Sequence, residues 1–369
     1  MAATDFAALD TARKKVWAAE IWQAGRDANF WMSNGFVGTG TNNVIQRITD
    51  LTRTEKGDEC IMQLVSDLQN DGVAGDNLLE GNEEAMFNDS ISIRIDQLRH
   101  GVRSKGMMSE QRTVLRFRST AKDKLAFWFA DKLDEMMFLV AAGIGFTFKT
   151  DGTTRGSTQL ASLQFAADIT PPSNGRVRFA NAATSKASLS ATDKLNWNMI
   201  VQLQSYAKRK RMKPIRSGGR EYFALLLSTE QCRDLKTDTT YQTLVSRAAP
   251  RGDANPLFKN ALAVIDGCVI YEHNKTPNTL GLGTGSKWGV SGTVDGAQAM
   301  LLGAQALGFA TINDMEYEES DNTDYKNRPG IAVGRMIGML KPQFASLPDN
   351  NTKQDFGVVS LYTAASATS

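Results

Sequence analysis

The sequence predicts an α+β protein in which a long hairpin and a long helix precede a second region of mixed helices and strands. Three observations support this prediction. Apolar and polar residues alternate over residues 90–98, which is the period of a half-buried strand. Apolar residues recur at steps of three and four from Ser109 to Ala142, which is the period of a helix. Helical and strand-like patterns are then interleaved between residues 190 and 325.

The composition of the 369 residues is that of an ordinary globular protein, with 41% hydrophobic and 22% charged residues. Such a chain can bury a sizeable core, and its length predicts about two to three domains. The 42 Lys and Arg residues nearly balance the 40 Asp and Glu residues. A dedicated duplex-DNA binder is usually strongly basic on one face, so the charge balance does not favour that class.

The cysteines and apolar runs exclude several other classes. Cys60, Cys232 and Cys268 are widely spaced and form neither a disulfide framework nor a zinc motif. Acidic residues interrupt the N-terminus where the apolar core of a signal peptide would lie. The longest apolar run, Met136–Phe146, is shorter than the about 20 residues that a bilayer crossing needs. We therefore expect a soluble protein that is made in a cytoplasm and does not bind a membrane.

The motifs of common catalytic sites are missing from the sequence. The two histidines, His100 and His273, share no metal-ligand spacing, and there is no Gly-x-Ser-x-Gly turn. Residues 281–288 come nearest to a phosphate-binding loop, but Ser286 precedes Lys287 where a P-loop needs Gly-Lys-Ser/Thr. We expect a flexible surface loop there, and we expect no enzyme, catalytic residue, cofactor or metal.

Residues 1–56 predict an N-terminal arm. The arm is rich in tryptophan and phenylalanine, and Thr11–Ala24 is the one stretch with the pattern of a short amphipathic helix. Exposed apolar patches mark interaction sites, so the arm is expected to lie on a neighbouring subunit, or alternatively to pack on its own domain. The candidate interface residues in the arm are Trp22, Trp31 and Phe36.

Residues 57–105 predict a two-stranded hairpin whose tip is rich in turn-forming and acidic residues. Its strands are Cys60–Leu68 and Ser90–Leu98, and one face of the second strand carries three isoleucines. An isolated hairpin is marginally stable in water, so that face must be covered by the chain's own core or by another subunit. The candidate interface residues in the hairpin are Gly72, Asp76, Glu80, Glu83, Glu84, Ile91, Ile93 and Ile95.

The strongest helical pattern, Ser109–Ala142, lies within residues 106–144. Its apolar residues form a single stripe, and Gly143 and Gly145 end it. At 1.5 Å per residue, a continuous helix would be about 50 Å long. Helices of this length are uncommon in a protein of mixed composition, and this one is typical of a rigid scaffold.

The rest of the chain divides into three regions. Residues 145–189, rich in Gly, Ser, Thr and Pro, predict a connecting region, and residues 190–325 predict a second α+β domain. In that domain Thr192 or Asp193 would cap a helix that runs to about Lys210. The remaining expected elements are a strand at 222–227, a capped helix at 228–235, two strands within 261–271, and C-terminal strands at 330–340 and 356–362 within residues 326–369.

Seven cations fall within Lys208–Arg220 at the end of the expected helix. They favour contact with nucleic-acid phosphates, ion pairing with acidic segments of the same chain or a neighbouring copy near residues 80–84 and 316–324, support of the helix dipole, or a solvated face. Aromatic residues do not interleave with the cations, which argues against stacking on single strands. The basic patch consists of Lys208, Arg209, Lys210, Arg211 and Lys213.

The order of arm, hairpin, long helix, α+β domain and returning strands resembles the HK97-like coat-protein fold of tailed phages. Several colinear segments resemble the major capsid family of the N-four-like phages in particular. These segments are residues 43–46 with 50–51, 71–76 with 79–84, 266–273, 302–306, and 324–338.

This resemblance implies a major capsid protein that self-assembles as hexamers and pentamers into an icosahedral shell around double-stranded DNA. It implies an extended loop at 57–105 that clasps an adjacent subunit, an axial domain at 190–325, and a peripheral domain made of the 106–144 spine helix and the 326–369 strands. The implied partners are further copies of the chain, separate scaffolding, portal and decoration proteins, and packaged DNA through weak non-specific contact. The alternative is a nucleic-acid-binding protein that uses residues 208–220.

Overall fold

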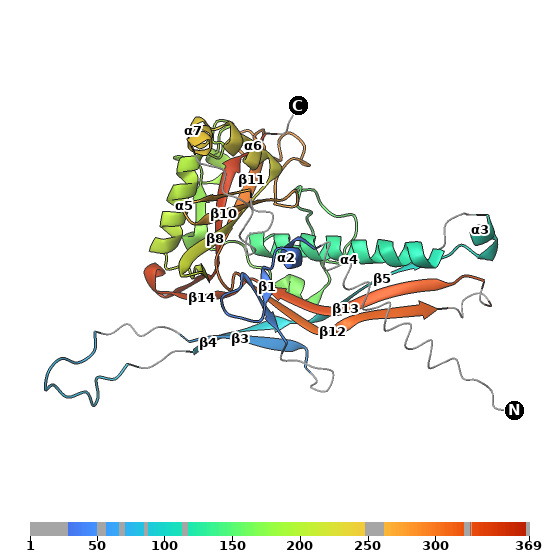
Figure 1. The fold of residues 1–369 in the computed structure, drawn as a ribbon, viewed down its shortest axis with the longest axis horizontal. Coiled ribbons are helices and arrows are strands. Elements are labelled where there is room, and N and C mark those ends of the chain that lie inside the picture. The colour runs from blue at the N-terminus through green and yellow to red at the C-terminus, as the bar shows by residue number, and fades with distance from the viewer. Residues whose placement is uncertain are drawn as a thin grey trace.

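The computed structural model describes residues 29–49, 57–65, 71–84, 88–112, 117–247, 262–320, 325 and 327–366. Their helices and strands form two lobes that meet at a long helix, α4 (Phe117–Ala142). In Figure 1 one lobe stands over the left end of α4, and an elongated sheet runs beneath the same helix. Within these residues, no helix has the length and apolar character needed to cross a bilayer.

Helix α4 is shorter than the sequence predicts. Met107–Gln111 form a separate helix, α3, and Arg112 lies in a turn, so the expected continuous helix from Ser109 is wrong. The 26 residues of α4 span about 39 Å. No glycine or proline lies between α3 and α4, so the helical spacing did not reveal the interruption. The predicted end is confirmed, because Gly143 follows α4 with a φ of +69°.

The lower lobe is a five-stranded sheet in the order β1-β2-β12-β13-β5. Its long strands β12 and β13 are antiparallel, and β2 joins β12 in parallel. Helix α4 packs across β13 and β5 on one face of this sheet. The strands are β1 (Val37–Gly38), β2 (Ile45–Ile48), β12 (Leu307–Ser320), β13 (Gly330–Leu340) and β5 (Asp96–Arg103).

The upper lobe is a seven-stranded sheet in the order β6-β16-β11-β8-β10-β9, with β7 paired to β8. Buried aliphatic side chains fill these strands, and residues 133–142 at the end of α4 are buried beside them. The strands are β6 (Val177–Phe179), β7 (Ile215–Ser217), β8 (Arg220–Leu227), β9 (Ala263–Ile265), β10 (Cys268–Glu272), β11 (Gly296–Leu302) and β16 (Val358–Ala364). Two sheets with helices packed on them confirm the α+β class.

Strand pairing does not follow the domain boundary predicted at residue 325. Strand β12 precedes that boundary but pairs with β13 in the lower lobe, whereas β16 follows it and pairs with β11 in the upper lobe. The chain thus crosses between the lobes more often than the predicted order of regions implies. Long-range pairing decides which sheet a strand joins, and the alternation within a single strand carries no such information.

The upper-lobe helices agree with the sequence except at one cap. Asn196, rather than Thr192 or Asp193, caps α5 (Trp197–Arg209) by accepting a hydrogen bond from the Met199 amide. Asp193 instead accepts hydrogen bonds from Ser190 and Asn181. Helix α6 (Thr229–Thr237) has the predicted Ser228 cap, with Gln231 completing a capping box, and α7 (Thr239–Arg247) follows it.

Residues 145–189, predicted as a connecting region, contain short 3₁₀ turns and β6 of the upper lobe. The turns are η1 (Gln164–Asp168), η2 (Asn174–Arg176) and η3 (Lys186–Ser188). A small two-stranded sheet lies at the junction between the two lobes. It is a hairpin of β14 (Gln343–Ser346) and β15 (Thr352–Asp355), with the 3₁₀ turn η5 (Leu347–Asp349) between the strands.

Buried charges hold this junction together. Lys341 donates to Asp355 at 2.9 Å, and both side chains are 1% exposed. Arg176 donates to the backbone oxygen of Asp355 at 2.9 Å and to the Asp349 carboxylate at 3.2 Å. Because a buried ion without its partner is strongly destabilising, these pairs fix the β14–β15 hairpin against the upper lobe.

Candidate assembly surfaces

The aromatic residues of the N-terminal arm that the structure describes are part of the chain's own core. Trp31 in α2 (Phe30–Ser33) is 0% exposed, and Phe36 is 6% exposed. Their rings lie 4.8 Å from Phe138 and 5.0 Å from Tyr271, respectively. The prediction that Trp31 and Phe36 contact a neighbour is therefore wrong, because α4 and β10 already cover both rings. Trp22 and the expected helix at 11–24 lie outside the described residues.

The start of α2 is anchored by a buried carboxylate. The Phe30 amide donates to Asp134 at 3.0 Å, and the Asn29 side chain accepts from the Met32 amide at 2.9 Å. Burial raises the pKa of Asp134 to about 6. His273, stacked on Phe138 at 4.7 Å, has its pKa lowered to about 4 by burial. His273 is thus a packing residue.

The isoleucine face of the hairpin is also covered by the chain itself. Strands β3 (Glu59–Val65) and β4 (Asn88–Arg94) pair antiparallel, and the side chains of β4 alternate in burial as predicted. Ile93 is 0% and Ile95 9% exposed, and Ile91 packs on the same small cluster, which includes Met62. Of the two covers that the sequence left open, the chain's own core covers Ile93 and Ile95, because the hairpin lies on β12 and β13. For the half-buried Ile91, contact with a neighbour stays a prediction.

The hairpin tip behaves differently, because it extends far from the body of the protein at the left of Figure 1. Residues 71–84 carry five carboxylates and no cation. Leu78 is 69% and Leu79 60% exposed. Local hydrogen bonds shape the loop, including one from the Asn82 side chain to the Leu78 carbonyl at 2.9 Å. The predicted interface residues Gly72, Asp76, Glu80, Glu83 and Glu84 all lie in this acidic loop, and all but the half-buried Glu84 are exposed.

At the opposite end, where Figure 1 places α3, the chain exposes cations and methionines that the sequence analysis missed, near the carboxylates Glu316, Glu318 and Glu319 of β12. Met107 is 60% and Met108 65% exposed. The exposed cations Arg99, Arg103 and Lys105 precede them in β5 and the turn after it. We call these five residues the basic end. The sequence does show two adjacent methionines after closely spaced cations, but it does not show that these side chains are exposed.

The basic patch at the end of α5 is partly neutralised within the chain. Lys210 forms an ion pair with Asp349, and Lys213 donates to Gln305 at 3.1 Å. Lys208, Arg209 and Arg211 are exposed. Intrachain pairing therefore accounts for part of the patch, but the acidic partner is Asp349 and not one of the two segments that the sequence favoured.

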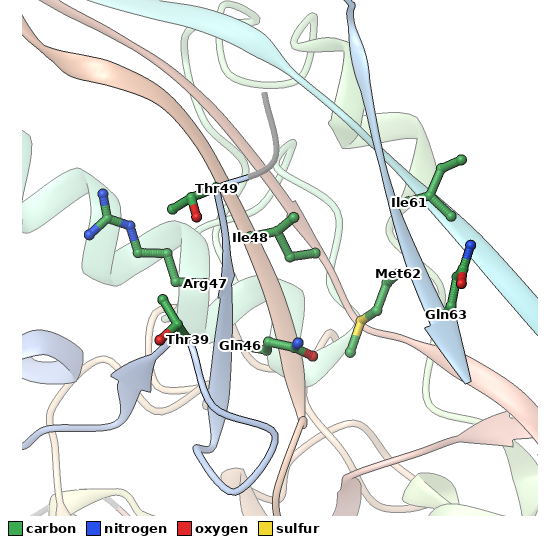
Figure 2. A pocket seen from close by; sticks show the side chains of 8 residues that line it. All are labelled: Thr39, Gln46, Arg47, Ile48, Thr49, Ile61, Met62 and Gln63. Carbon is green, nitrogen blue, oxygen red and sulfur yellow. The ribbon is translucent and has the colours of Figure 1, made fainter. Parts of the chain in front are cut away.

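A groove of about 220 Å³ lies between β2 and β3. Figure 2 shows Gln46 and Met62 on the two facing strands, with their side chains directed into the space between them. Among the described residues that line the groove there is no carboxylate, histidine or cysteine. Its lining residues are Thr39, Gln46, Arg47, Ile48, Thr49, Ile61, Met62 and Gln63. No cluster of three metal-ligating side chains occurs among the described residues.

The glycine-rich loop at 281–288 lies on the surface, but it is held firmly. Lys287 pairs with Asp295 at 2.5 Å, and Trp288 packs on Tyr362 with ring centres 5.5 Å apart. These contacts differ from the expected flexible loop, because two large side chains fold back onto the upper lobe.

Comparisons with known proteins agree with this architecture. A family profile described as phage capsid protein matches residues 2–367. The major capsid protein of Pseudomonas phage KPP25 is 42% identical over 372 residues, which cover 98% of each chain. The capsid of Ralstonia phage GP4 is 27% identical with a TM-score of 0.78 and covers 92% of each chain.

A more distant relative shows the same fold. The capsid of cyanophage Pam1 is 20% identical with a TM-score of 0.69, over 90% of this chain and 92% of that chain. The resemblance to HK97-like coat proteins is confirmed by these matches. The chain belongs to the phage capsid protein family and has the HK97-like fold.

Proposed function

We propose that this chain is the major capsid protein of a tailed phage and assembles as hexamers and pentamers into an icosahedral shell around double-stranded DNA. The chain would be a component of the virion and would have no enzymatic activity. Membership of the phage capsid family and 42% identity to a phage major capsid protein support this proposal.

The observation that carries the proposal is the complementarity of the two ends of the molecule. The acidic loop offers carboxylates and two exposed leucines, and the basic end offers cations and two exposed methionines. A loop from one copy would dock on the basic end of the next. Contacts of this heterologous kind generate closed rings when the rotation between copies closes, as capsomers require.

The remaining roles follow the same proposal. The seven-stranded lobe would form the axial domain at capsomer centres, and the sheet beneath α4 would form the peripheral domain. Scaffolding, portal and decoration proteins would be separate chains. The alternative, a nucleic-acid-binding protein that uses residues 208–220, is less favoured because Lys210 and Lys213 already have partners within the chain.

Electron microscopy of the expressed full chain, with and without its scaffolding protein, tests the proposal. We expect polyhedral shells from the wild type. Replacing both exposed leucines, Leu78→Ser with Leu79→Ser, should abolish shells while the thermal unfolding of the subunit is unchanged. The control Phe127→Ser replaces an apolar residue of α4 that is 64% exposed and lies outside the hairpin, and it should still assemble. A wild type that stays monomeric under both conditions would refute the proposal.

A further inference from the structure

Three cations gather around one tyrosine ring at the end of α5, the helix on the left flank of the upper lobe in Figure 1. The distances to the centre of the Tyr206 ring are 4.9 Å for the Arg178 guanidinium, 5.3 Å for the Arg209 guanidinium and 5.9 Å for the Lys210 amine. The Tyr206 hydroxyl donates to the carbonyl of Gly175 at 3.0 Å, which holds the ring in place. Arg178 lies in β6 and is distant from α5 in the sequence, so these residues come together only in the folded chain.

The charges in this cluster are not balanced. Asp349 is shared between Lys210 and Arg176, and within the described part of the chain no ion pair involves Arg178 or Arg209. Both side chains are exposed, as are Lys208 and Arg211 in the same turn. The face of the Tyr206 ring attracts both guanidinium groups, and the helix C-terminus favours the charge of Arg209. An anion beside either guanidinium group would offset its unpaired charge.

The chemistry of the cluster favours phosphate over the acidic loop of another copy. Two planar guanidinium groups match the oxygens of phosphate groups. The acidic loop would also bring Leu78 and Leu79, which need an apolar partner. The large apolar side chains exposed in the described residues include Met107 and Met108 at the basic end, but none in β6 or α5. The loop is therefore better matched by the basic end.

We propose that Arg178 and Arg209, positioned by Tyr206, bind backbone phosphates of duplex DNA. This inference rests on the proposed function, in which the shell encloses double-stranded DNA. Contacts to phosphate carry no sequence information, and each neutralised phosphate releases counterions into solution. Two contacts per subunit give weak, salt-sensitive binding without sequence preference.

Fluorescence anisotropy of a labelled 20-base-pair duplex with the full chain tests this proposal. Replacing both arginines, Arg178→Gln with Arg209→Gln, should weaken binding at least tenfold in low salt. It should also reduce the slope of log Kobs against log salt by about 2, since each phosphate contact contributes about 1. The matched control Lys124→Gln with Lys194→Gln removes the same charge from exposed positions elsewhere and should change binding less than twofold.

Two results would overturn the inference: unchanged DNA binding by the arginine variant, or an equal loss in both variants. Unchanged DNA binding together with failed shell assembly would assign the cluster to contact between subunits. Electron microscopy of the same variants separates this inference from the proposed function. If the wild type forms no shells, the proposed function fails, whereas the phosphate site is judged by the anisotropy data.

Discussion

At the residue scale, Asp134 and His273 are two buried titratable groups that meet at the same aromatic cluster. Asp134 holds the start of α2, and His273 stacks on Phe138 four residues further along α4. Lys275 and Asp131 are the nearby charges that influence both groups. The two pKa shifts are opposite in sign, so their effects on stability nearly cancel between about pH 4 and pH 6.

The sign of each effect on stability follows from whether the folded or the unfolded state binds more protons. With its pKa raised from 3.8 to about 6, Asp134 holds a proton in the folded state that the unfolded state releases, so its contribution to stability falls as pH rises through this range. With its pKa lowered from 6.5 to about 4, His273 has the reverse effect, and its contribution is lost on acidification.

We therefore expect that replacing either residue alone reveals the pH dependence of stability that the other residue contributes. Relative to wild type, Asp134→Asn should lose about 2 kcal/mol of unfolding free energy between pH 6 and pH 4.5, and His273→Phe should gain a similar amount. Urea unfolding of the unassembled subunit at several pH values measures both slopes. Asp123→Asn, an exposed site on α4, is the control and should follow wild type. Parallel pH profiles for all four proteins would contradict the argument.

At the element scale, β4 fits onto the five-stranded sheet at two glycines. A Cβ on Gly338 would overlap the carbonyl oxygen of Arg94, and a Cβ on Gly308 would lie 2.6 Å from the Ile93 side chain. No room remains between the hairpin and the β12–β13 pair at these points. These glycines allow the close approach that buries Ile93.

We expect Gly338→Ala to reduce the unfolding free energy by about 1–3 kcal/mol, because the added methyl group overpacks this contact. Gly330→Ala lies in the same strand with its nearest neighbouring atom 3.7 Å away, and it should stay within about 0.5 kcal/mol of wild type. Urea unfolding of both variants provides the measurement. Equal stability of the two would show that β4 is not seated as tightly as the structure indicates.

The elements also show which structural information the sequence carries. Strand β13 was predicted with its observed bounds, and the β4 alternation was correct, because burial on a sheet face leaves a period of two. The aromatic content of the arm predicts that Trp31 and Phe36 contact a neighbour, which is wrong because aromatic content does not show which way a ring points. The Tyr206 cluster was missed because Arg178 lies far from the basic segment in sequence.

At the scale of the whole molecule, the proposed head-to-tail contact makes a prediction about symmetry. Reversing the acidic loop with Glu80→Lys, Glu83→Lys and Glu84→Lys gives a subunit with two basic ends. Reversing the basic end with Arg99→Glu, Arg103→Glu and Lys105→Glu gives a subunit with two acidic ends. Like charges then face each other in every contact, so neither variant should assemble alone.

A mixture of the two variants should behave differently, because each loop now finds an oppositely charged end on the other variant. The two must alternate around a ring, and alternation closes with six members but not with five. We therefore expect equimolar mixtures to form open sheets or tubes of hexamers without closed polyhedra, as seen by electron microscopy. Wild-type subunits in the same buffer are the control. Closed shells from the mixture, or assembly of either variant alone, would contradict the head-to-tail contact between acidic loop and basic end.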